Sequence, residues 1–230
     1  MIISGGTLET INYYVIDNYE GSCLKILGGT IRLRDTVETW AVAIHNRPNA
    51  KTEIVDGNVE CYAYSSAGAS LYNYGEMVIS GGNIYSELCT TIILSDYGGN
   101  YSPKLTINGG NIFGKNVYSV LSNATLGTAD IFGGVISGSS VNSGVITNSG
   151  TLNIRGGDIS SEDSVLLYNV KPGVATITNG KLTSQTTCIG NEATLNVTGG
   201  IIESFGGYYI LNNTGTVNVT GGTFTGNKGY

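Results

Sequence analysis

A pair of glycines recurs along the whole chain, each time between two short segments that alternate apolar and polar residues. Typical copies read TLNIRGGDI at 151–159 and TLNVTGGII at 194–202. A repeat of 20 to 28 residues over an entire chain is the signature of a repeat architecture, which decides the fold. The second residue of each pair falls at Gly6, Gly29, Gly57, Gly82, Gly110, Gly134, Gly157, Gly180, Gly200 and Gly222.

Each glycine pair is predicted to form a sharp corner of the backbone. The first position departs from Gly only at Asp56 and Asn179, the types of residue that best tolerate a left-handed backbone. We therefore expect a positive φ at the first position and a strict requirement for Gly at the second.

A second column lies between the corners and reads aliphatic, any residue, Asn. An Asn at this position can bend the strand and hydrogen-bond to the Asn stacked on it. Asp96, in Leu94-Ser95-Asp96, is the one departure that we find. The asparagines of the column are Asn18, Asn46, Asn73, Asn123, Asn148, Asn169, Asn191 and Asn213.

Short segments of period two that are rich in β-branched residues predict strands, and glycines at this density exclude helices. The sequence therefore predicts an all-β chain, a right-handed parallel β-helix (β-solenoid) of about ten coils. Leu152, Ile154, Ile159, Leu167 and their equivalents should fill its interior. Residues 1–230 should form a single domain, a fragment of a longer rod or a unit that stacks end to end, because neither end carries a capping element.

Rows such as TLNVTGGII and TVNVTGGTF, with the Asn column, resemble the right-handed parallel β-helix proteins over essentially all 230 residues. They look most like the Gly-Gly repeats of bacterial surface adhesins and of bacteriophage tail fibres and tailspikes. The Asn column is similar to the Asn ladder of the pectate lyase family, which implies a structural role for its members. The resemblance implies a place outside the cell, on the cell surface or on a virion.

Charged residues make up only 12% of the chain, and its net charge is −6. This balance argues against a nucleic-acid partner, and no apolar run is long enough for insertion into a membrane. The N-terminus lacks the pattern of a secretion signal, which we expect to lie outside this sequence.

Cys23, Cys61, Cys89 and Cys188 show no metal-binding spacing, so we expect ordinary thiols, no metal and no cofactor.

Aromatic residues gather in the first half of the chain. The position after the Asn column reads Tyr19, Arg47, Tyr74 and Tyr97 in the first four coils, which predicts a vertical stripe. Long spacings add two loops, RDTVETW and DYGGNYSP, which contain Trp40 and Tyr101. Flat rings beside a basic donor suit a cell-surface polysaccharide or an envelope component. The alternative is that these tyrosines only cover a β-surface.

Catalytic candidates are scarce. Glu9, Arg32 and Glu60 follow one another three residues past successive corners, which places the two carboxylates roughly 9.6 Å apart, near the upper end for an inverting glycosidase. The alternative for this trio is an exposed salt ladder. His45, the one histidine of the chain, occupies the variable place before Asn46 and is expected to face solvent.

Two further surfaces leave alternatives open. A flat Thr/Asn face suits ice binding or simply solubility. An apolar column three residues before the Asn column is either an exterior stripe, such as the axis of a homotrimer, or a second buried position. The Thr/Asn face comprises Thr194, Asn196, Thr198, Thr216, Asn218 and Thr220, and the apolar column Val15, Ala43, Ser70, Ile93, Val120, Val145, Leu166, Cys188 and Ile210.

Together these patterns favour a non-enzymatic structural or adhesive module of a bacterial surface protein or phage fibre that binds cell-surface glycan. The rival is a polysaccharide-degrading glycosidase or lyase similar to a tailspike. Ice binding is a minor alternative.

Overall fold

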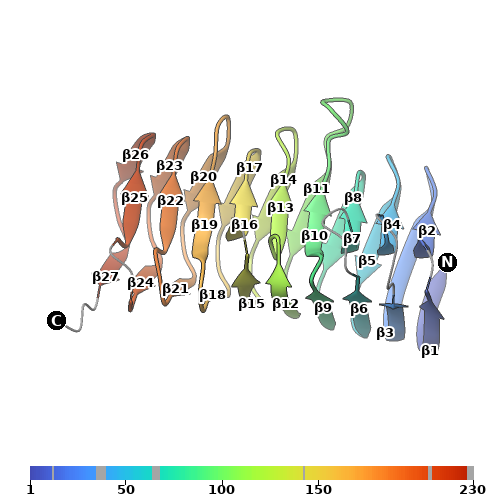
Figure 1. The fold of residues 1–230 in the computed structure, drawn as a ribbon. Coiled ribbons are helices and arrows are strands. Elements are labelled where there is room, and N and C mark those ends of the chain that lie inside the picture. The colour runs from blue at the N-terminus through green and yellow to red at the C-terminus, as the bar shows by residue number, and fades with distance from the viewer. Residues whose placement is uncertain (12, 35–39, 64–67, 142, 207–208, 227–230) are drawn as a thin grey trace.

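The chain winds into stacked parallel coils in the computed structural model, which describes residues 1–11, 13–34, 40–63, 68–141, 143–206 and 209–226. The coils follow one another from the N-terminal to the C-terminal end of the stack (Figure 1). Every strand pairs in parallel with its equivalent in the next coil, and no helix occurs in the described ranges. The predicted all-β parallel solenoid is confirmed, with nine strands stacked in one of its sheets.

One sheet contains nine strands, one from each successive coil, and each strand ends at or beside the Asn column. The strands are β2 (Tyr14–Asn18), β4 (Val42–Asn46), β7 (Ala69–Asn73), β10 (Thr90–Leu94), β13 (Leu121–Asn123), β16 (Gly144–Asn148), β19 (Val165–Asn169), β22 (Ile189–Asn191) and β25 (Leu211–Asn213).

The other sheet contains the strands on both sides of the glycine corners. Two of its strands, β1 (Ile2–Thr10) and β3 (Cys23–Arg34), run through the corner. The strands before later corners are β5 (Lys51–Ile54), β8 (Glu76–Ile79), β11 (Lys104–Ile107), β14 (Thr128–Ile131), β17 (Thr151–Ile154), β20 (Val174–Ile177), β23 (Thr194–Val197) and β26 (Thr216–Val219). The strands after them are β6 (Asn58–Tyr62), β9 (Asn83–Glu87), β12 (Asn111–Val117), β15 (Val135–Ser140), β18 (Asp158–Ser161), β21 (Lys181–Ser184), β24 (Ile201–Ser204) and β27 (Thr223–Gly226).

The core follows from the alternation of the strands. In β17 the aliphatic side chains point inward, and the polar ones between them face solvent. Leu152, Ile154, Ile159 and Leu167 are fully buried, as predicted. Because each residue of a ladder lies on its equivalent in the next coil, this pattern makes one continuous aliphatic interior.

The corners differ from the prediction in one respect. All ten second glycines have a positive φ, whereas the first residue of each pair does not. The first position is restricted by space instead: a Cβ on Gly81 would lie 2.4 Å from the carbonyl oxygen of Val55 in the preceding coil. Asp56 is accepted at a first position, and there its carboxylate receives a hydrogen bond from the Gly57 amide.

The Asn column forms a hydrogen-bonded ladder inside the stack. Each side-chain amide donates to the carbonyl oxygen of the next one, over 2.8 Å from Asn18 to Asn46 and 2.7 Å from Asn46 to Asn73. A second run joins Asn123, Asn148, Asn169, Asn191 and Asn213.

The fourth rung of the ladder is Leu94, so the assignment of Asp96 to this column is wrong. Leu94 pairs in register with Asn73 on one side and Asn123 on the other. It cannot donate a hydrogen bond, and the side-chain oxygen of Asn123 is left without a partner among the described residues. Asp96 lies two residues further on, where its carboxylate accepts from the backbone amides of Gly98 and Leu126.

The apolar column points inward, so an exterior stripe is wrong. Ala43, Ser70, Val120, Val145, Leu166 and Cys188 are buried, while Val15 and Ile210 at its ends are half-buried. Ile93 does not belong to the column, because the shift at Leu94 places Thr91 there. In most coils the residue of this column and the aliphatic residue that follows it both pack inside. The column therefore gives no support for a homotrimer axis.

Candidate functional site

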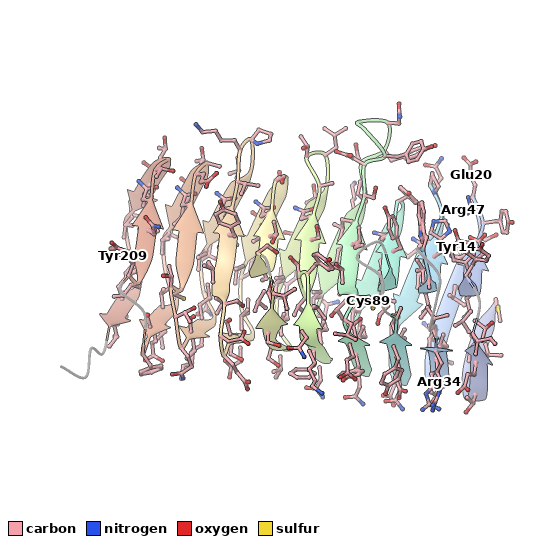
Figure 2. All side chains as sticks on the ribbon, viewed as in Figure 1. Tyr14, Glu20, Arg34, Arg47, Cys89 and Tyr209 are labelled. Atoms are coloured by element: carbon pink, nitrogen blue, oxygen red, sulfur yellow. The ribbon has the colours of Figure 1, made fainter. Side chains whose placement is uncertain are left out.

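Asp17, His45 and Tyr72 form an outward-facing column near the N-terminal end, at the position just before the Asn column. β2, β4 and β7 pair in register, which places the three residues on adjacent coils. Figure 2 labels Tyr14 and Arg47 in the same part of the stack.

Asp17 is held by two neighbours from the next coil. Arg47 donates to both of its oxygens, from Nε to Oδ1 over 2.9 Å and from Nη2 to Oδ2 over 2.7 Å. The Nδ1 atom of His45 lies 3.0 Å from Asp17 Oδ1. This bidentate pair fixes the guanidinium, whose Cζ also lies 5.2 Å from the centre of the Tyr19 ring.

Aromatic rings enclose His45, so its predicted exposure is wrong: the residue is only 2% exposed. Tyr14 stacks on the imidazole with centroids 4.9 Å apart. Tyr72 and Tyr74 meet it edge to face at 5.8 and 5.6 Å. Its backbone position does face outward, but the neighbouring tyrosines are large enough to shut out solvent.

A second set of rings lies over this cluster. Tyr74 is buried, and Tyr97 and Tyr101 meet its ring at centroid distances of 6.1 and 5.7 Å. Trp40 lies 5.5 Å from Tyr72. Both Tyr97 and Tyr101 come from the predicted loop DYGGNYSP, which rises above its neighbours between β10 and β11 (Figure 1).

These rings bound a groove of about 380 Å³, which we call the aromatic groove. A second hollow of about 540 Å³ lies next to it and shares Pro48, Tyr74 and Tyr101 with it. Both lie in the range of small-ligand sites. The aromatic groove is lined by Tyr14, Trp40, His45, Arg47, Pro48, Tyr74, Tyr97 and Tyr101.

The charges at the base of the aromatic groove balance each other. Burial alone would raise the pKa of Asp17, but the hydrogen bonds from Arg47 and His45 outweigh it and hold that pKa below its usual value. Burial also dominates at His45, where it lowers the pKa despite the contact with Asp17. The imidazole is therefore neutral at pH 7 and donates from Nδ1, while its Nε2 has no partner among the described residues.

This arrangement predicts a loss of stability on mild acidification. The pKa of His45 is lower in the folded state than the ordinary value of about 6.5. The unfolded chain therefore binds more protons, and stability present above about pH 6.5 is lost as the pH falls toward the folded pKa. The urea midpoint should fall between pH 7.5 and pH 5.

His45→Phe is the control for this effect, because it keeps a stacking ring and removes the titration. Its urea midpoint should change much less over the same interval, since Asp17 titrates only at lower pH. An equal fall in both proteins would contradict the assignment.

The structure brings five of the six predicted binding residues to one place. Trp40, Arg47, Tyr74, Tyr97 and Tyr101 all line the aromatic groove. The sixth, Tyr19, lies beside it under the Arg47 guanidinium and is 64% exposed.

The predicted vertical stripe is wrong at its fourth member. The position stacked on Tyr74 is Ser95, whose amide donates to Asn73 as the amide of Tyr74 does to Asn46. Tyr97 reaches Tyr74 from the loop instead. Of the other predicted loop, residues 35–39 lie outside the described residues.

Three members of the cluster were missed from the sequence, namely Tyr14, Asp17 and Tyr72. Asp17, His45 and Tyr72 all occupy the position just before the Asn column. Comparing this position from coil to coil in the sequence would have identified Asp17 and Tyr72. Tyr14 lies three residues before Asp17, at the start of β2, and nothing in the repeat pattern marks it.

Glu9, Arg32 and Glu60 lie in register on β1, β3 and β6. Arg32 donates from Nε to Glu60 over 2.6 Å and from Nη1 to Glu9 over 3.2 Å. Both carboxylates thus share one guanidinium, which is the geometry of the salt ladder.

The same column continues into a second aromatic surface on the other sheet. Tyr85 follows Glu60 and Phe113 follows Tyr85 in register, with the two rings stacked at 5.8 Å. Tyr62 lies 5.4 Å from Tyr85. Tyr62 and Phe113 are exposed on this surface.

The Thr/Asn face is present near the C-terminal end. Thr194 pairs with Thr216 and Asn196 with Asn218, whose side chains are hydrogen-bonded over 2.9 Å. Ice binding on this face stays a prediction.

No group of three potential metal ligands occurs among the described residues. Nor do these residues contain a helix that is long and apolar enough to cross a membrane.

Comparisons with protein-family models, curated proteins and solved structures find no match for this chain.

Proposed function

We propose that this protein is a non-enzymatic β-solenoid module of a cell surface or virion that binds saccharide chains in the aromatic groove. The single observation that carries this proposal is the groove itself, where four tyrosines and the one tryptophan of the chain surround a base of hydrogen-bonding groups. Aromatic faces pack against the C–H faces of sugars, and fixed polar groups orient the hydroxyls.

The electrostatics favour an uncharged saccharide. An unpaired cation in the groove would select a carboxylated or sulfated sugar, but Arg47 is neutralised by Asp17 through two hydrogen bonds. The second hollow contains the ion pair of Lys51 and Glu76, 2.9 Å apart, and a further cationic side chain, Lys104, so the argument from charge applies to the aromatic groove alone.

Rigid support also favours this role. Tyr72, His45 and Arg47 stand on β-strands or directly after them, and the Asn ladder runs beneath them. A rigid scaffold lowers the ordering cost of binding. Tyr97 and Tyr101 stand on the loop and are exposed, so they can adjust to a ligand.

The test is binding of a glycan array and of insoluble bacterial polysaccharides by the protein and by Tyr97→Ala with Tyr101→Ala. We expect the double variant to bind about 10- to 100-fold more weakly, since aromatic anchors dominate such sites. Both residues are exposed, so the fold should persist.

Tyr62→Ala with Phe113→Ala is the matched control, because it removes two exposed rings from the other sheet. It should bind like the unchanged protein. Equal binding by all three proteins would contradict the location in the groove, and loss only in the control pair would move the site to the second aromatic surface.

A further inference from the structure

Two cysteines lie side by side in the interior of adjacent coils. Cys61 is on β6, and Cys89 follows β9 after Leu88, whose backbone takes a positive φ of 69°. Both cysteines are 0% exposed. Figure 2 labels Cys89 at a level between those of Arg47 and Arg34.

Their sulfur atoms are close enough to react with little movement. The two Sγ atoms are 3.0 Å apart, and a disulfide bond of about 2.05 Å would need an approach of about 1 Å. The other two cysteines have no such neighbour: Cys23 is exposed, and the contact made by Cys188 is to the carbonyl oxygen of Leu182 at 3.7 Å.

The environment also favours a reactive thiol at this place. The neighbouring thiol of Cys61 and the hydroxyl of Ser86 hydrogen-bond to Cys89 and lower its pKa, although burial opposes them. At Cys188 the net shift is in the other direction, because burial dominates and raises the pKa to about 12. The thiolate is the form that attacks a disulfide.

We propose that Cys61 and Cys89 are a disulfide-forming pair that covalently ties two neighbouring coils of the solenoid. The oxidant is a small-molecule disulfide, RSSR. One thiolate attacks RSSR and releases RSH, and the second thiol then attacks the mixed disulfide and releases another RSH. Two electrons and two protons pass from the cysteines to RSSR, and the Cys61–Cys89 bond forms.

The cross-link would close the segment that carries β7, β8 and β9. This segment holds Tyr72 and Tyr74, which form part of the aromatic cluster. The bond would therefore brace the coil beneath the groove. The inference is independent of the proposed function, because it rests on the two thiols alone.

The test uses Cys23→Ser, which removes the exposed thiol and leaves three cysteines. The folded, reduced protein is incubated with oxidised glutathione and warmed to just below its unfolding midpoint, so that the coils open locally. It is then acid-quenched, denatured and alkylated with N-ethylmaleimide. We expect one adduct, at Cys188, and a Cys61–Cys89 peptide in the proteolytic digest.

Cys89→Ala in the same background is the control and should take two adducts, at Cys61 and Cys188, with no cross-linked peptide. The unchanged protein reports whether the oxidant is active, because its exposed Cys23 should gain glutathione. Three adducts in Cys23→Ser under an active oxidant, or glutathione retained on Cys61 or Cys89, would overturn the proposal.

Discussion

Gly82→Ala is expected to lower the free energy of unfolding by about 2 to 5 kcal/mol, the sum of a left-handed backbone penalty and a steric clash. Gly82 has a φ of +81°, and a Cβ there would lie 2.6 Å from the carbonyl oxygen of Gly57 in the preceding coil. Urea unfolding followed by circular dichroism measures the loss.

Gly6→Ala is the matched control for this prediction. Gly6 occupies the same corner position with a φ of +80°, but no atom of another described residue beyond its chain neighbours lies within 4 Å of its added Cβ. Its loss should be about 1 to 2 kcal/mol, from the backbone alone. Equal losses at both positions would show that close packing between coils does not restrict the corner.

Asn46→Ala is the second large effect, with an expected loss of about 3 to 5 kcal/mol. The side chain of Asn46 is fully buried and takes part in five hydrogen bonds. It donates to the Ala50 and Glu76 carbonyls and to Asn73, and it accepts from Asn18 and Thr52. Alanine would leave these buried groups without their partner.

Asn213→Ala, at the exposed end of the second run of the ladder, should cost only about 1 kcal/mol, because water can replace the lost bonds. The comparison uses the same urea titrations. A cost at Asn46 no greater than that at Asn213 would contradict a structural role for the buried ladder.

The fold was predictable because its determinants repeat. Ten glycine corners and an Asn column fix both the bends and the stacking, and an alternating segment such as 151–154 leaves only one way to bury its aliphatic side chains. The exact register between neighbouring strands was harder to predict from the sequence. Leu94 and Asp96 are two residues apart, and a spacing that varies from coil to coil cannot show which one lies on Asn73.

The same limit applies to the corners. Asp56 and Asn179 suggested a positive φ at the first position, but the positive φ belongs to the glycine that follows. The first position is restricted by the backbone of the neighbouring coil, and a contact between coils is not visible in a single repeat.

The site was only partly predictable. An uneven distribution of aromatic residues pointed to the correct coils, because stacking places equivalent positions above one another. The burial of His45 was missed, since it depends on Tyr14, Tyr72 and Tyr74 closing over the ring. Three-dimensional packing between different columns has no signature in the repeat pattern.

The fluorescence of Trp40 reports directly on saccharide binding in the aromatic groove. Trp40 is the only tryptophan of the chain and lines the aromatic groove, so its emission reports on that site alone. Titration with uncharged gluco-, galacto- and manno-oligosaccharides should produce a saturable change for at least one of them, and Tyr97→Ala with Tyr101→Ala should need about 10- to 100-fold more ligand for the same change. An emission that stays constant across the panel, or an unchanged titration curve in the double variant, would contradict saccharide binding in the groove.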